Sequence, residues 1–319
     1  MNIDGNKFEI FVDRRTKLPT RIERLIYHPV LGDVVLATHF TEYRNANGLM
    51  LPMRIVQRLD GRLTLSDIRL VTASVNTNAG NLAAPDSIRS APAFEQPVNV
   101  TAEEVTAGVW LLAGQSHHSV AIEMGNHMLL VEAPQNEART LAVIRRVREL
   151  KPGKPIRAVI NTHHHFDHAG GLRAAIAEGL TVITHSGNMA LFSDIARRRH
   201  VIVADALAKA PKKARIETVT TKRVLKDGSR TVEIHHIRGN PHAATLLMVY
   251  LPAEKLLIQA DVYSPPAPNA PAPPAFPFAA NLVDNIDRLK LDVDRIVPIH
   301  GPVAPMTDLR AAAAANRGR

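Results

Sequence analysis

The sequence of 319 residues contains no cysteine, which excludes disulfide bonds and zinc sites built from thiolates. Aromatic residues make up only 4% of the chain, so few rings are available to stack against the bases of a single-stranded nucleic acid. No apolar run approaches the roughly 18 residues of a membrane-spanning helix, and we expect no such span. Any metal site must therefore be built from histidine and oxygen ligands.

Acidic residues are the minority among the charged side chains, with 30 against 39 lysines and arginines, and the net charge is +9. Basic residues cluster at 145–148, 197–199 and 212–215. A basic surface is what phosphate binding requires, but the scarcity of aromatic residues argues against a nucleic-acid surface. We interpret the clusters as solvated helix faces and expect no nucleic-acid partner.

Two regions of different character follow each other along the chain. Residues 1–95 alternate apolar and polar side chains between turn signals, which predicts short strands at 8–12, 20–26, 33–38, 53–57 and 62–65. The pattern indicates a small antiparallel β domain with a structural, dimerising or substrate-covering role, compatible with a homo-oligomer. Residues 80–97 have the composition of a linker, and we place a second domain at residues 98–319.

The first residues of the chain indicate the cellular compartment in which the protein is expected. Residues 1–7 are polar and carry no secretory signal, so the chain as it stands is expected to be cytoplasmic. The start is abrupt, however, as though it entered an existing β domain. A true start upstream of Met1 would change the expectation to a periplasmic or secreted protein.

The most informative stretch is Asn161-Thr162-His163-His164-His165-Phe166-Asp167-His168. It follows an apolar run, 156–160, that predicts a buried strand, and it precedes a short amphipathic helix expected over 172–179. Alternate side chains of an extended stretch point the same way, so His163 and His165 can hold one metal ion. Asp167 and His168 come where the chain turns and can reach a second ion. Imidazole and carboxylate are zinc-type ligands.

The spacing His-x-His-x-Asp-His after a strand resembles the signature of the metallo-β-lactamase superfamily. The resemblance covers roughly residues 100–310 and implies an α/β fold, the αββα sandwich, for the second domain. It also implies three further ligands downstream, each beside the end of a strand. The chain has candidates for all three in the right order, namely His242, Asp261 and His300.

What the resemblance implies for the site is a centre of two Zn²⁺ ions. The ligands expected for the first ion are His163, His165 and His242, and those for the second are Asp167, His168 and His300, with Asp261 bridging. Histidine and carboxylate do not select zinc strictly, so iron or manganese can occupy the same positions. Two divalent cations, two carboxylates and a bridging hydroxide sum to about +1, which favours an anionic small-molecule substrate.

Two departures from the family pattern lie close to the expected ligands. The strand before the motif ends in Glu132 where the family usually has aspartate, and this residue either orients a metal-bound histidine or faces solvent. The run 242–245 reads His-Ala-Ala-Thr in place of the common His-Thr-x-Gly, so the loop around His242 is altered. His164 faces away from the ligands and is expected to be structural.

Other residues are candidates for substrate contact or for support of the ligands. His117 and His118 lie in a loop that borders the metal site in the family, and a surface pair is the alternative. His185 ends a strand and is a candidate for the lining of the cleft. Tyr263 is a further candidate, because it opens a segment with seven prolines in residues 265–277. We expect this segment to form one side of the cleft, with a plain spacer as the alternative.

We interpret the chain as a metal-dependent hydrolase in which a hydroxide bridging two zinc ions attacks a carbonyl, while Asp167 orients the nucleophile. The fold alone does not fix the reaction. The cysteine ligand of the best-known zinc β-lactamases is absent, and so is the glycine- and arginine-containing signature of glyoxalase II-type thioesterases. An ester or lactone hydrolase with promiscuous β-lactam hydrolysis is preferred. The alternatives are a phosphodiesterase or nuclease, a thioesterase of the glyoxalase II type, and a purely structural metal site.

Overall fold

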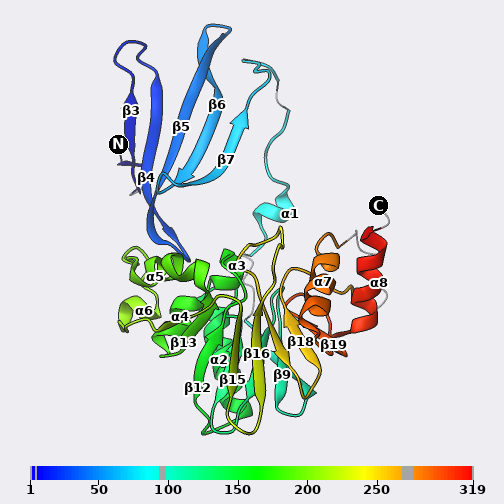
Figure 1. Ribbon diagram of the computed structural model, residues 1–319. Coiled ribbons are helices and arrows are strands. Elements are labelled where there is room, and N and C mark those ends of the chain that lie inside the picture. The colour runs from blue at the N-terminus through cyan, green and yellow to red at the C-terminus, as the bar shows by residue number, and fades with distance from the viewer. Residues whose placement is uncertain (1, 4–5, 79, 93–97, 268–275, 318–319) are drawn as a thin grey trace. The chain divides into compact units, whose positions relative to one another are not determined.

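A computed structural model describes residues 2–3, 6–78, 80–92, 98–267 and 276–317 of the chain (Figure 1). The chain forms two compact units, one of Met1–Pro97 with Arg199–Val203 and the other of Val98–Arg198 with Ala204–Arg319. None of the described helices has the length and apolar character that a membrane span requires. The greater part of the proline-rich segment, residues 268–275, lies outside the described residues.

The first unit is built on a five-stranded antiparallel sheet in which each strand pairs with its neighbour in sequence. Its strands are β3 (Glu9–Val12), β4 (Pro19–His28), β5 (Gly32–Ala46), β6 (Leu49–Leu59) and β7 (Leu63–Arg69). Smaller elements of this unit are β1 (Asn2–Ile3), β2 (Asn6–Lys7) and the one-turn helix α1 (Asp86–Arg89). The predicted antiparallel sheet ahead of the second domain is confirmed.

The hairpin between β5 and β6 is longer than the apolar alternation indicated. Residues 41–46 of β5 are mostly polar, so they carry no period-two signal of a buried face. Their pairing with β6 is fixed by a tight turn at Asn47 and Gly48, which have φ of 50° and 87°. Two successive positive φ angles are what a two-residue hairpin turn requires, and Asn-Gly supplies them at low cost.

The second unit contains a seven-stranded and a six-stranded sheet. Across the first sheet the order is β14 (Ile216–Val219), β13 (Thr181–His185), β12 (Ile156–Ile160), β11 (Met128–Val131), β10 (Ser119–Glu123), β9 (Val109–Ala113) and β8 (Thr101–Thr106). Strands β11 to β14 run parallel to one another, and the remaining pairs of this sheet are antiparallel.

Across the second sheet the order is β15 (Lys222–Lys226), β16 (Thr231–His236), β17 (Leu247–Leu251), β18 (Leu256–Gln259), β19 (Arg295–Pro298) and β20 (Ala304–Pro305). The pair β18 and β19 is parallel, whereas the other pairs are antiparallel. The two sheets pack face to face through one apolar cluster, to which Val120 and Ile160 contribute from the first sheet and Val249 and Val297 from the second.

Helices cover the outer face of each sheet (Figure 1). On the first sheet these are α2 (Glu137–Leu150), α4 (Leu172–Ala177) and α5 (Met189–Arg197), with α6 (Ala206–Lys209) against α4. On the second they are α7 (Ala279–Leu289) and α8 (Met306–Arg317). A short helix, α3 (Phe166–Ala169), follows β12, and a 3₁₀ turn (Ser186–Asn188) precedes α5. The predicted αββα sandwich is confirmed.

Helix α4 differs from the amphipathic helix expected over 172–179. It ends at Ala177, and all six of its residues are buried. Arg173 is tolerated there because its guanidinium donates to Asp205 at 3.0 Å and to the backbone oxygen of Ile195 at 2.9 Å. A paired, buried arginine has the same polar signature in the sequence as an exposed one, so the pattern wrongly indicated a solvated face.

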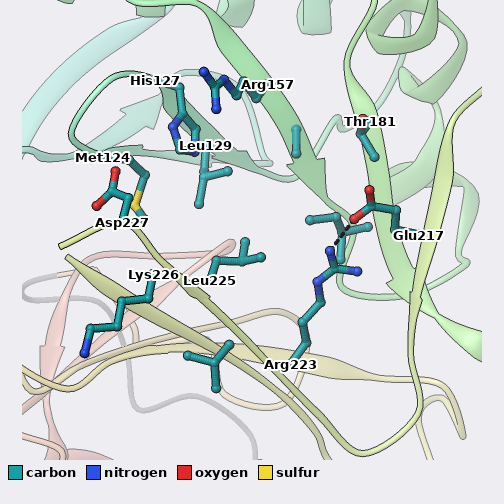
Figure 2. Close-up of a pocket in the computed structure, with 13 residues that line it drawn as sticks. Met124, His127, Leu129, Arg157, Thr181, Glu217, Arg223, Leu225, Lys226 and Asp227 are labelled. Atoms are coloured by element: carbon teal, nitrogen blue, oxygen red, sulfur yellow. Dashed lines mark hydrogen bonds and ion pairs between the residues drawn. The ribbon is translucent and has the colours of Figure 1, made fainter. Parts of the chain in front are cut away.

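A hollow of about 410 Å³ opens between the two sheets at the edge where β12 and β13 begin (Figure 2). Arg157 and Thr181 line it from those strand beginnings, and Arg223 lines it from β15, where it pairs with Glu217. The first four predicted metal ligands, at residues 163–168, follow the opposite end of β12. This hollow is therefore separate from them.

Candidate metal centre

The residues predicted as metal ligands lie beyond the ends of strands, and the fold brings those ends together. They are His163, His165, Asp167 and His168 after β12, His242 before β17, Asp261 after β18 and His300 after β19. Each of the seven belongs to at least one group of ligand-type side chains whose donor atoms lie within 4.8 Å of one another. Segments separated by more than a hundred residues therefore meet at one point.

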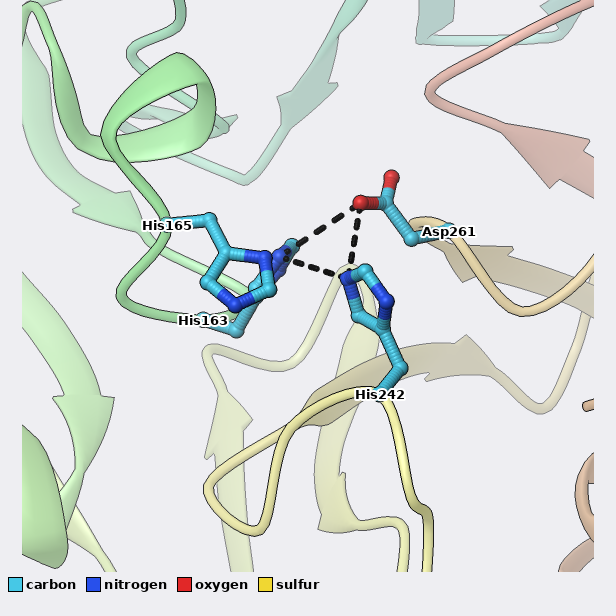
Figure 3. A group of neighbouring side chains, drawn as sticks. All are labelled: His163, His165, His242 and Asp261. Atoms are coloured by element: carbon cyan, nitrogen blue, oxygen red, sulfur yellow. Dashed lines mark hydrogen bonds and ion pairs between the residues drawn. The ribbon is translucent and has the colours of Figure 1, made fainter. Parts of the chain in front are cut away.

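The first group consists of three imidazoles and one carboxylate that point toward one another (Figure 3). Nε2 of His242 lies 3.3 Å from Nε2 of His163 and 2.9 Å from Oδ2 of Asp261. The rings of His163 and His165 lie with their centroids 4.6 Å apart, as expected for alternate residues of an extended run. These are the residues that the family resemblance assigns to the first ion, together with the bridging aspartate.

The second group is centred on the other oxygen of the same aspartate. Oδ1 of Asp261 lies 3.0 Å from Nε2 of His168 and 2.9 Å from Nε2 of His300. The two imidazole nitrogens are 3.4 Å apart, and Oδ2 of Asp167 lies 3.7 Å from Nε2 of His168. Asp261 thus reaches both groups, one through each carboxylate oxygen.

The donor distances fit bound metal ions. With metal–nitrogen bonds of about 2.0–2.1 Å, two ligands of one ion lie about 2.9–3.4 Å apart for angles between octahedral and tetrahedral. Oδ1 of Asp261 is buried, and the Nε2 atoms of His168 and His300 lie 3.0 and 2.9 Å from it. Imidazole nitrogens and carboxylate oxygens that converge at such distances are ligands of the zinc type, so the donor set fits a bound cation.

A second layer of hydrogen bonds orients the ligand-type histidines. Nδ1 of His168 donates to Oε2 of Glu132 at 2.7 Å, and the backbone N–H of Thr162 donates to Oε1 at 2.7 Å. Glu132 is completely buried, so it is not a solvent-facing strand end. Nδ1 of His300 donates to the backbone oxygen of Ser116 at 2.8 Å. Such contacts leave Nε2 of each ring free for a metal.

Two carboxylate residues of the centre, Glu132 and Asp261, have a strained backbone conformation. Glu132 and Asp261 follow the ends of β11 and β18 with φ of 72° and 63°. This left-handed conformation is uncommon for residues other than glycine. It costs about 1–3 kcal/mol at each position and persists only where the surroundings require it, as at binding and catalytic sites.

Without metal, the titratable groups of the centre have strongly displaced pKa values. Burial raises the pKa of Asp261, but the neighbouring imidazoles, His163 first, hold this carboxyl well below its usual range. Burial lowers the pKa of His168, yet the carboxylates of Glu132 and Asp261 overcome that effect and raise it to about 10. Burial, assisted by neighbouring histidines, lowers the pKa of His165 to about 4.

These values predict that zinc uptake releases a proton. His168 of the metal-free protein is protonated at every pH below about 10, and its imidazole must lose a proton before it binds a cation. His165 and Asp261 are already deprotonated at neutral pH and release none. We expect zinc affinity to rise by about tenfold per pH unit from neutrality to about pH 10. Calorimetry in buffers of different ionisation enthalpy measures the proton, and an affinity independent of pH would contradict this assignment.

The remaining predicted site residues divide into two sets. His117 reaches the centre, with its Nε2 3.1 Å from Oδ2 of Asp167, and it forms a group of donors with His168 and His300. His185 lies apart, with its ring 4.4 Å from that of His236. The neighbour of His117, His118, is half-buried and belongs to none of the three donor groups among the described residues.

Tyr263 is not where a substrate contact was expected. Its side chain is buried in the apolar cluster between the second sheet and helices α7 and α8, with its ring 5.1 Å from that of Phe276. Phe278 lies instead beside the centre, with its ring centroid 5.6 Å from that of His242. His164 turns away from the ligands, and its Nδ1 is hydrogen-bonded to Oγ1 of Thr245 at 3.2 Å.

Two hydroxyl residues that sequence reasoning did not single out contact the histidines that follow them. Oγ1 of Thr162 is hydrogen-bonded to Nδ1 of His163 at 3.0 Å, and Oγ of Ser116 to Nδ1 of His117 at 2.8 Å. A serine or threonine directly before a ligand-type histidine was the signal in the sequence.

Comparison with known proteins agrees with this geometry. The family model of the metallo-beta-lactamase superfamily matches residues 137–300. A metallo-beta-lactamase from Pontibacter korlensis superposes with a TM-score of 0.52 at 17% identity over 69% of this chain and 100% of that one. The metallo-beta-lactamase FIM-1 from Pseudomonas aeruginosa, in its mono-zinc form, superposes with a TM-score of 0.50 at 18% identity over 70% of this chain and 98% of that one.

A curated relative is similar in sequence over the same region. The alpha subunit of 2,4-dinitroanisole O-demethylase from Nocardioides sp. (strain JS1661) is 25% identical over 210 residues, which are 66% of this chain and 60% of that protein. The family match extends over half of the chain and contains all seven predicted ligands, the last of which, His300, is its final residue. The chain therefore belongs to the metallo-beta-lactamase superfamily, a family of metal-dependent hydrolases.

Proposed function

We propose that the chain is a binuclear zinc-dependent hydrolase that acts on a small ester or lactone, with β-lactam hydrolysis as a side reaction. One observation supports two ions above all. Oδ2 of Asp261 lies 2.9 Å from His242 of the first group, and Oδ1 lies 2.9 Å from His300 of the second. A carboxylate with one oxygen toward each group is suited to bridging ions about 3.5–4 Å apart.

Two zinc ions bound here would polarise a carbonyl oxygen and lower the pKa of a shared water toward neutrality. The chain supplies the groups around that reaction. The side chain of Asp167 is 53% exposed, against 14% for Asp261, so it faces arriving substrate and water. Asp167 accepts a hydrogen bond from the attacking water and thereby orients it. Phe278, beside His242, offers an apolar surface for the acyl part of a substrate.

Charge bears on the class of substrate. Two divalent cations with Asp167, Asp261 and one hydroxide sum to about +1, and the chain as a whole carries +9. Both favour the capture of a substrate with a carboxylate. A small anion engages few charges, so added salt weakens its capture only mildly, whereas a nucleic acid loses affinity steeply with salt.

The curated relative suggests a second candidate reaction. Its name assigns it to the O-demethylation of 2,4-dinitroanisole. In such a dinitro-substituted methyl aryl ether, the ring carbon that carries the oxygen is electron-poor. Hydroxide can add to that carbon and expel methoxide, which takes up the proton of the newly formed phenol, so that the products are the phenolate and methanol. The same nucleophile would then act on an aryl ether in place of a carbonyl.

A substrate panel tests the proposal. Zinc-loaded protein is assayed on nitrophenyl esters, lactones, thioesters, β-lactams, bis-nitrophenyl phosphate and 2,4-dinitroanisole, at low and high salt. We expect the highest kcat/KM on an ester or lactone with only a mild salt dependence. A preference for the phosphodiester with a steep loss at high salt would replace the proposal with a nuclease. Turnover of the aryl ether above all others would favour the demethylase reaction.

A further inference from the structure

One histidine outside the seven predicted ligands reaches the second group. His117 lies in the loop between β9 and β10, and one of its ring nitrogens is within 4.8 Å of nitrogens of His168 and His300. Its Nε2 lies 3.1 Å from Oδ2 of Asp167. Its ring stands edge-on to that of His300 with the centroids 4.2 Å apart. The side chain is only 11% exposed, so it is held in place and is not a surface histidine.

The hydrogen bonds of His117 match those of a ligand in the first group. Nδ1 of His117 is hydrogen-bonded to Oγ of the preceding Ser116 at 2.8 Å, as Nδ1 of His163 is to Oγ1 of the preceding Thr162 at 3.0 Å. In both residues Nδ1 is engaged by a hydroxyl, which leaves Nε2 as the nitrogen that faces the centre. A partner on the far nitrogen is the usual support of a metal-bound histidine.

Ser116 serves two imidazoles of the same group. Its backbone oxygen accepts from Nδ1 of His300 at 2.8 Å, while its Oγ holds His117 and also accepts from Nε2 of Gln135 at 3.1 Å. A single residue thereby directs Nε2 of His300 and Nε2 of His117 toward the same region. Gln115, just before it, has a φ of 62°, so the backbone of this loop is held in an uncommon conformation.

We infer that His117 is a ligand of the second metal ion, bound through Nε2. The inference rests on the proposed binuclear centre and adds a protein ligand to it. The second site then has three imidazoles, from His117, His168 and His300, as the first has from its own three histidines. Asp167 stands at the exposed rim of this set, 3.1 Å from His117, a separation typical of two ligands of one ion.

This assignment makes a prediction about metal selectivity. Three imidazoles suit zinc or iron, whereas manganese prefers carboxylate and water ligands. The second site should therefore bind zinc much more tightly than manganese in the wild-type protein. Loss of His117 should reduce the ratio of zinc affinity to manganese affinity at the second site, because carboxylates form a larger share of the ligands that remain.

The alternative role for His117 is a hydrogen bond to Asp167 without contact with the metal, and His117→Gln separates the two. The glutamine amide can still donate to the carboxylate of Asp167, but it is a poor metal ligand. Second-site zinc affinity is measured by competition with a chromophoric chelator, and total zinc by elemental analysis. We expect His117→Gln and His117→Ala to lose second-site affinity by about 100-fold or more. Loss of an orienting partner alone costs about 10- to 100-fold.

Cobalt substitution gives a readout that does not depend on activity. The visible absorption of the second cobalt ion should change in His117→Gln while that of the first remains. Ser116→Ala, which removes only the hydroxyl partner, should weaken the second ion by about tenfold and keep its spectrum. His118→Gln, in the same loop, is the matched control and should bind two ions as the wild type does.

Two outcomes would overturn the assignment. If His117→Gln binds the second ion with an affinity within about threefold of the wild-type value, and its cobalt spectrum is unchanged, His117 only forms a hydrogen bond with Asp167 and is not a ligand. A wild-type protein that binds fewer than two ions would contradict the binuclear centre itself, and this inference with it. The first failure appears only in the variant and the second already in the wild type, so the two are distinguishable.

Discussion

Asp261→Ala is expected to remove both metal ions and to lower kcat/KM by at least about 1000-fold, well beyond the roughly 10- to 100-fold cost of losing an orienting partner. The physical reason is that one side chain contacts both groups, with each oxygen 2.9 Å from a different histidine. Its removal leaves imidazoles that repel one another when protonated and have no shared counter-charge. Elemental analysis and ester hydrolysis on the same preparation measure the two losses together.

Two further variants make the Asp261 result specific. Asp261→Asn keeps the volume but loses the charge, and we expect it to retain about one ion because a neutral amide bridges poorly. Asp292→Ala removes an exposed aspartate that pairs with Lys255 far from the donor groups, and it should keep both ions. An Asp261→Ala protein with two ions and full turnover would show that this residue is not the bridge.

The ligands of the first motif were predicted from local spacing, whereas the three downstream ligands were predicted from the resemblance to the metallo-β-lactamase superfamily. His163 and His165 are two residues apart in an extended run, and the downstream ligands each stand beside the end of an apolar strand. The strand order β17-β18-β19 then brings those ends to one edge of the second sheet. Local spacing is therefore enough for the first pair of histidines, and the family's strand order, which the resemblance implies, is needed for the downstream ligands.

The contacts that support the centre were harder to predict, because they join segments without a shared pattern. His117 meets Asp167 across 50 positions, and Glu132 meets His168 across 36. Whether a polar strand-end residue faces solvent or the interior depends on the backbone conformation at that residue. Glu132 has a φ of 72°, which no periodicity in the sequence reveals.

For a related reason, the expectations for one aromatic and one basic side chain were wrong. Tyr263 lies two residues after Asp261, a predicted ligand, yet its ring is buried in the outer apolar cluster. Arg173 reads as a solvated position, yet it is buried against Asp205. The described residues of the first unit include none of the grouped ligand-type residues, and the dimerising or substrate-covering role of this unit stays a prediction.

Glu132→Ala is expected to weaken the second site by about 100-fold and to destabilise the protein. The variant leaves Nδ1 of His168 without its acceptor and the buried N–H of Thr162 without a partner. An unsatisfied buried donor costs about 1–3 kcal/mol, and the cavity left by the side chain adds to that cost. Alanine has the same backbone restriction at a φ of 72° as glutamate, so relief of strain does not offset the loss. Chemical denaturation of the metal-free protein measures the destabilisation.

Glu132→Gln separates charge from packing, because glutamine fills the same volume and can still accept from Thr162. Glutamine removes one of the two carboxylates that raise the pKa of His168, while burial and Asp261 remain, so this pKa should fall below about 10. Between the lowered pKa and about pH 10, the imidazole of the metal-free variant is already neutral. Zinc uptake in that window should release about one proton fewer than in the wild type. Equal proton release by both proteins would mean that the charge of Glu132 does not set the protonation state of His168. Glu132 would then support His168 only by filling the space beside it.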